Sequence, residues 1–93
     1  MAIEIRHDEA GHRFVADLGG RTAELTYVER DATTVIFTHT FVPPELRGAG
    51  VAAALAARAL DWARETGRHV VPACSYVAAY LQRHPEYEQL LAR

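Results

Sequence analysis

The chain has 93 residues and a net charge of −2 with neutral histidines; 49% of its residues are hydrophobic and 24% charged. This length predicts a single domain, residues 1–93, with a limited core. The weakly acidic balance argues against nucleic acid as the main partner. No apolar run reaches the roughly 20 residues that span a bilayer, so we expect no membrane association.

The chain has a single cysteine, Cys74, which limits the kinds of covalent and metal site that it can form. It excludes an intramolecular disulfide and a cysteine-based zinc site, and this fits a reducing compartment. The N-terminus lacks the apolar segment of a signal peptide, and His39 and His69 lack the short spacing of a metal pair. We therefore expect a cytoplasmic protein without a bound metal.

The first half of the chain predicts four antiparallel strands. Segments 3–7, 13–18 and 22–28 alternate apolar and polar residues, as half-buried strands do. Turn residues separate them, and Gly19-Gly20 is a strong hairpin signal. The β-branched and aromatic run 34–41 is the fourth strand, in which simple alternation places His39 on the face of Phe37 and Phe41.

The second half predicts a helix, a strand and two short helices. Two prolines at 43 and 44 end the fourth strand, and residues 51–65 carry a helical apolar stripe that includes Leu55, Ala59 and Trp62. Residues 69–72 form a fifth strand, and the strand–helix–strand order implies a right-handed crossover that places it parallel to the fourth. Helices over 77–83 and 86–92 complete an α/β (α+β) fold.

The loop before the long helix has the composition of an anion site. Its sequence is Arg47-Gly48-Ala49-Gly50-Val51-Ala52. The glycines let the backbone approach a ligand closely, the helix start offers unpaired N–H groups, and Arg47 adds a fixed charge. The alternative is a tight strand-to-helix connection with a surface arginine.

Residues 42–52 fit V-x-P-x-x-R-G-x-G-x-A, which resembles the acyl-CoA pyrophosphate loop of the GNAT superfamily of N-acetyltransferases, with core pattern [Q/R]-x-x-G-x-[G/A]. Arg47, Gly50 and Ala52 occupy the patterned positions. The run Cys74-Ser75-Tyr76 after the last strand is similar to the small single-domain branch of that superfamily. The resemblance covers nearly the whole chain.

The resemblance implies a minimal GNAT fold: the antiparallel meander, the crossover helix, the parallel fifth strand and C-terminal helices. It also implies acetyl-CoA or coenzyme A as cosubstrate. The pantetheine arm would lie where the fourth and fifth strands splay apart, and the diphosphate would lie on the loop amides. The implied binding residues are Val42, Arg47, Gly48, Ala49, Gly50, Val51, Ala52 and Tyr76.

Three residues are candidates for catalysis. His39 is the candidate base, since imidazole titrates near neutral pH; the alternative is a packed or surface strand residue. Cys74 is an acyl-accepting nucleophile paired with His39, a proton donor to the CoA thiolate, or a buried small side chain. Tyr80, with Tyr76 one turn before it, is a candidate donor to the thiolate or packs the C-terminal helix on the sheet.

The acceptor side departs from larger GNAT enzymes, which carry helices between the first two strands. Here residues 8–12 form only a turn, which leaves that side open and suits an exposed amine, including a protein N-terminus or lysine. The expected function is an acetyl-CoA-dependent N-acyltransferase. The alternatives are a non-catalytic CoA-binding or sensing module and a structural interaction domain.

Overall fold

A computed structural model describes residues 3–92 of the chain. It contains one five-stranded sheet in the order β1-β2-β3-β4-β5. Strands β1 to β4 form an antiparallel meander, and β5 pairs with β4 in parallel. This confirms the predicted meander, crossover helix and parallel fifth strand. The strands are β1 (Arg6–Asp8), β2 (Arg13–Leu18), β3 (Arg21–Asp31), β4 (Thr34–Phe41) and β5 (His69–Pro72).

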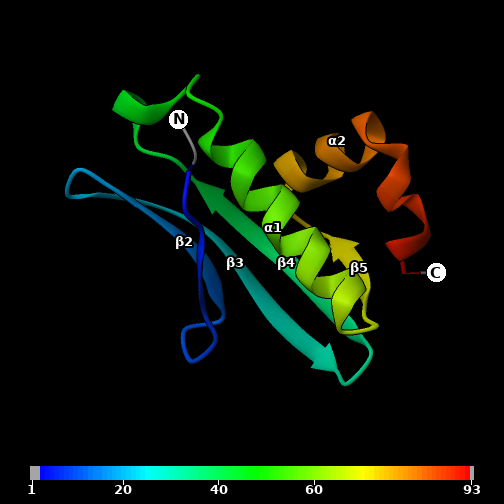
Figure 1. Cartoon of the computed structure of the whole chain (residues 1–93). Coiled ribbons are helices and arrows are strands. Elements are labelled where there is room, and N and C mark those ends of the chain that lie inside the picture. The colour runs from blue at the N-terminus through cyan, green and yellow to red at the C-terminus, as the bar shows by residue number, and fades with distance from the viewer. Residues whose placement is uncertain (1–2, 93) are drawn as a thin grey trace.

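Two α-helices and two 3₁₀ segments complete the chain. They are η1 (Pro44–Leu46), α1 (Val51–Glu65), α2 (Ser75–Arg83) and η2 (Pro85–Leu90). Figure 1 shows α1 lying across one face of the sheet, with α2 and the C-terminal segment beside it. The predicted bounds of α1 and β5 agree with the structure.

The core lies between α1 and the inner face of the sheet. Leu55 and Ala59 on α1 are fully buried, and Trp62 is nearly so, as the helical periodicity predicts. They pack with Phe14 and Phe37 on the strands. This single layer of apolar contacts fixes the position of the N-terminal end of α1 beside the end of β4.

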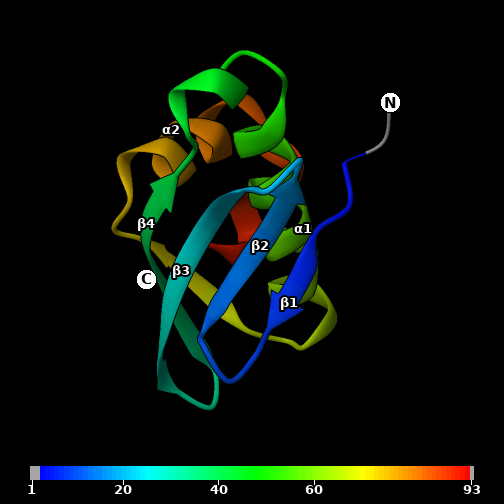
Figure 2. The ribbon, with the colours of Figure 1, turned by 90° about the vertical axis from the view of Figure 1, so that its left-hand side faces the viewer.

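No helix of the described residues covers the outer face of the sheet (Figure 2). Val28 and Phe41, both on this face, are 51% and 44% exposed. Val28 pairs with Ile36, and Ile36 pairs with Val71 on β5. The open face is therefore partly apolar and reachable from solvent up to the end of β4.

The ends of several elements differ from the sequence prediction. The first strand pairs only over Arg6–Asp8, not from Ile3, and β3 extends to Asp31. Helix α2 begins at Ser75, two residues earlier than predicted. The final helix is a 3₁₀ segment that ends at Leu90, because the next residues pair with the edge strand: Leu91 forms a bridge with Val70, and Ala92 donates its N–H to the Val70 carbonyl (2.9 Å).

A β-bulge in β4 overturns one prediction that matters for the site. Thr26 pairs with His39, but the next β3 residue, Tyr27, pairs with Phe37, so Thr38 is an extra residue in β4. A bulge of this kind reverses the alternation of all later residues. Phe37 faces the core, whereas His39 lies on the outer face, not on the face of Phe37.

Candidate functional site

A pocket lies where the loop after β4 enters α1. Its volume is about 270 Å³. Gly48 and Gly50 both have left-handed backbones, with φ of 85° and 83°, so the loop curls around the helix start. The lining comprises Val42, Leu46, Arg47, Gly48, Gly50, Val51, Ala52, Ala53 and Tyr76. Seven of the eight predicted binding residues thus meet in one pocket; Ala49 does not line it.

The pocket has the electrostatics of an anion site. The first helical bond of α1 runs from the Ala54 N–H to the Gly50 carbonyl (3.0 Å), so the N–H groups of residues 51–53 have no acceptor within the helix. Gly50, the N-cap, provides no side-chain cap, and no acidic residue lies in the first turn. The free amides and the positive end of the helix dipole therefore favour a bound anion.

Arg47 is held at this pocket by its own loop. Its Nε donates a hydrogen bond to the Val42 carbonyl (3.1 Å), which fixes the first part of the side chain while the guanidinium keeps further donors. Glu45, two residues earlier, is paired with Arg21 on β3 (2.9 Å). That ion pair partly neutralises the carboxylate nearest in sequence to the loop and ties the β2–β3 hairpin to η1.

Beyond the pocket, β4 and β5 separate. Their last paired residues are Phe37 and Pro72, and the Cys74 N–H still donates to the Phe37 carbonyl (2.9 Å). After that point β4 continues to Phe41, while the other strand turns into α2. The two strands therefore form a fork at this point.

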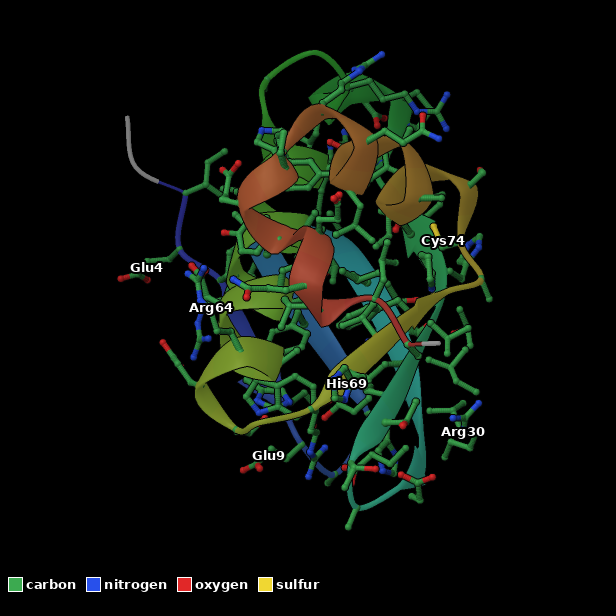
Figure 3. All side chains as sticks on the ribbon, turned by 90° about the vertical axis from the view of Figure 1, so that its right-hand side faces the viewer. Glu4, Glu9, Arg30, Arg64, His69 and Cys74 are labelled. Atoms are coloured by element: carbon green, nitrogen blue, oxygen red, sulfur yellow. The ribbon has the colours of Figure 1, made fainter. Side chains whose placement is uncertain are left out.

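Cys74 lies at the fork, at the start of α2 (Figure 3), and is 8% exposed. Its Sγ is 3.2 Å from Thr40 Oγ1. Thr40 is on the inner face because the bulge shifts it opposite Leu25. Simple alternation along β4 predicts that Thr40 faces outward, so the sequence does not predict its contact with Cys74.

The structure does not bring His39 to Cys74. His39 is exposed on the outer face, beside Thr26, whereas Cys74 belongs to the core cluster on the other face. The two side chains therefore flank the fork from opposite sides of the sheet. A direct thiol–imidazole pair, one of the arrangements that the sequence leaves open, is not present in this conformation.

Tyr76 and Tyr80 lie one helical turn apart on α2. Tyr76 lines the loop pocket, and its ring centroid is 6.3 Å from that of Tyr80. Tyr80 stacks on His84, with centroids 3.8 Å apart. Burial raises the pKa of both tyrosine hydroxyls above the ordinary value, so each keeps its proton at neutral pH, the state that a proton donor requires.

Two features that metal-binding and membrane-spanning proteins carry are absent from residues 3–92. Within these residues, no group of three or more His, Cys, Asp or Glu side chains is placed to hold a metal ion. None of the helices in this range is long and apolar enough to cross a membrane.

The chain is similar in sequence to proteins of a known family. The sequence profile of the family described as GCN5-related N-acetyl-transferase matches residues 13–90. The chain is 33% identical to Protein NATD1 of Xenopus tropicalis over 86 residues, which cover 90% of this chain and 79% of that protein. Against Protein NATD1 of Homo sapiens the identity is 33% over 85 residues, covering 89% and 75%.

Two solved structures share the fold. The solution structure of a GCN5-like protein from Staphylococcus aureus superimposes with a TM-score of 0.75 at 28% identity, covering 97% of this chain and 88% of that one. The crystal structure of Ard1 from Thermoplasma volcanium gives a TM-score of 0.63 at 19% identity, covering 84% and 58%, and this shows the fold alone. On the profile match and the NATD1 relatives, the chain belongs to the GCN5-related N-acetyltransferase family.

Proposed function

We propose that the protein transfers an acetyl group from acetyl-CoA to an amine. The observation that carries this is the pocket at the start of α1, whose free amides and Arg47 suit a diphosphate. The fork between β4 and β5 starts next to that pocket. A thioester arm that runs from the one to the other would end near Cys74.

The amine acceptor would enter from the outer face. Helices α1 and α2 occupy the other side, whereas the described residues leave the outer face open (Figure 2). His39 lies on that face, where it can take a proton from the attacking amine. An open, shallow approach suits an amine on a polypeptide, such as an N-terminus or a lysine.

The proposed transfer is a direct displacement. The amine nitrogen forms a bond to the thioester carbonyl carbon, the C–S bond breaks, and the electron pair leaves on the CoA sulfur. His39 accepts the proton that the nitrogen loses. The Tyr80 hydroxyl or the Cys74 thiol supplies a proton to the leaving thiolate. A route through an acetylated Cys74 would require a base to take the thiol proton, and the Thr40 hydroxyl that contacts Sγ is too weakly basic for this.

A non-catalytic CoA-binding module is the second candidate. The separation of His39 from Cys74 favours it, because an acid and a base on opposite faces work together only if the substrate bridges them. Both functions predict acetyl-CoA binding, and only the first predicts turnover.

The test combines turnover with acetyl-CoA binding, and binding is measured by calorimetry. The protein is incubated with acetyl-CoA and peptides that present a free N-terminus or a lysine, and both acetylated peptide and free CoA are measured by mass spectrometry. Transfer that is lost in Arg47→Ala and retained in Arg6→Ala, an exposed arginine on β1, supports the proposal. Binding without acetylated product leaves the sensing module, and intact-protein mass shows whether Cys74 carries an acetyl group.

A further inference from the structure

The bulge at Thr38 decides which side chain of β4 faces Cys74. A regular register continued from Tyr27 and Phe37 would pair Thr26 with Thr38 and Leu25 with His39. His39 would then point into the core side, and Thr40 would point outward. The observed register is shifted by one residue, so Thr40 faces Cys74 instead.

Two threonine hydroxyls occupy the bulge. Thr26 Oγ1 and Thr38 Oγ1 are 2.8 Å apart, and Thr26 Oγ1 lies 3.3 Å from the His39 carbonyl. Each hydroxyl has one proton. A consistent arrangement has Thr38 donating to Thr26 Oγ1 while Thr26 donates to the His39 carbonyl. The two hydroxyls thus form a short hydrogen-bonded chain across the strand pair.

This chain stabilises the shifted register. A bulge disrupts the local ladder and leaves backbone groups without their strand partner. The Thr26 hydroxyl donates to the His39 carbonyl beside the bulge, and the single Thr38 proton can go to Thr26 Oγ1 or, as an alternative, to the Thr26 carbonyl at 3.3 Å. Without the hydroxyls, the balance between the shifted and the regular register would move toward the regular one.

We propose that Thr26 and Thr38 are positioning residues for the transfer, because their hydroxyl pair sets the bulge that turns His39 to the acceptor side and Thr40 toward Cys74. The inference rests on the proposed function. It attributes the separation of His39 from Cys74 to the bulge at Thr38, which places the base on the outer face and the hydroxyl–thiol pair on the cosubstrate side. Neither threonine is a catalytic residue.

The test uses a variant that keeps shape and strand propensity. Thr26→Val removes both hydroxyl contacts with little change in volume, and Val is favoured in strands. Thr26→Ser restores the hydroxyl. Thr22→Val is the matched control, since Thr22 is an exposed threonine of the same strand that donates to Asp17 (3.1 Å), away from the bulge.

With acetyl-CoA and a peptide acceptor, we expect Thr26→Val to lower kcat measurably and by at most about tenfold, because the loss of about one net hydrogen bond changes the ratio of the shifted to the regular register by no more than that factor. Its KM for acetyl-CoA should change less than about twofold, because the loop pocket is untouched. Thr26→Ser should recover most of kcat, and Thr22→Val should behave as the wild type. Unchanged kcat in a folded Thr26→Val protein would overturn the proposal.

A second readout does not depend on turnover. Alkylation of Cys74 by iodoacetamide is followed against pH in the folded proteins. If the register shifts in Thr26→Val, an imidazole replaces the Thr40 hydroxyl beside the thiol, so the profile should gain an inflection near neutral pH. Superimposable profiles for wild type and Thr26→Val would refute the positioning role. If the wild type lacks turnover, the proposed function fails, and the alkylation profiles alone decide the register.

Discussion

Replacing Gly50 by alanine separates the backbone of the loop from its ligand function. Gly50 is the N-cap of α1, with φ of 83° and ψ of 11°. A Cβ built there meets no heavy atom within 4 Å, so the substitution causes backbone strain without a clash. An L-residue in the left-handed region costs about 1–2 kcal/mol.

That strain should lower the melting temperature by roughly 5–15 °C for a domain of this size, which leaves the protein folded at room temperature. The strain is relieved if the loop moves, and movement takes the amides of residues 51–53 out of position. Each hydrogen bond to a charged group is worth about 1.5–3 kcal/mol. We therefore expect the Kd for acetyl-CoA, measured by calorimetry, to rise at least tenfold.

Gly67→Ala is the matched control. Gly67 follows the other end of α1, with φ of 70° and no heavy atom within 4 Å of a built Cβ. It should lower the melting temperature by a similar amount and leave the Kd for acetyl-CoA unchanged. Wild-type affinity in Gly50→Ala, or an equal loss in Gly67→Ala, would refute the role of the loop backbone.

Three further predictions concern the base, the C-terminal segment and pH. His39→Ala should leave the acetyl-CoA Kd unchanged and lower kcat by about 10²–10⁴-fold. His69 is an exposed histidine at the start of β5, so His69→Ala should leave kcat unchanged. Equal kcat values in the two variants would exclude His39 as the base. Tyr87→Phe removes a donor to Asp61 (2.8 Å) and should lower the urea-unfolding free energy by about 1 kcal/mol without changing acetyl-CoA binding; an unchanged unfolding free energy would show that this bond adds no net stability. Burial raises the pKa of Tyr27 and Tyr87 to about 12, so their contribution to stability is fully present below pH 10 and is lost between pH 10 and about 12. Denaturant midpoints measured across that pH range should fall, and they should fall less in Tyr27→Phe. Midpoints that do not change with pH would contradict the assignment.

Local patterns were sufficient to predict most of the fold. The apolar stripe through Leu55, Ala59 and Trp62 gave the length and the buried face of α1, and the strand–helix–strand order gave the parallel pairing of β4 with β5. Both depend on periodicity and on the handedness of crossovers. The loop pocket was predictable for a similar reason, since Arg47 to Ala52 are contiguous.

The side chains around the fork between β4 and β5 were less predictable than the fork itself, because their placement depends on contacts between distant residues. The bulge at Thr38 appears only in the register between β3 and β4, in which Thr26 pairs with His39 and Tyr27 with Phe37, and nothing in the alternation of β4 marks it. The partner of Cys74 is therefore Thr40, which sequence analysis missed. His39 stays a candidate base on the outer face.

The most direct test of the central claim compares two thioesters in thermal melts. Acetyl-CoA carries the diphosphate that the loop is proposed to hold, and S-acetylpantetheine has the same thioester arm without phosphate. At about 100 times its Kd, acetyl-CoA should stabilise by roughly 2.7 kcal/mol and raise the melting temperature by on the order of 10 °C. S-acetylpantetheine should give little shift, and Arg47→Ala should reduce the acetyl-CoA shift. Absence of any shift at millimolar acetyl-CoA, or equal shifts with both compounds, would contradict the assignment of the pocket at the start of α1.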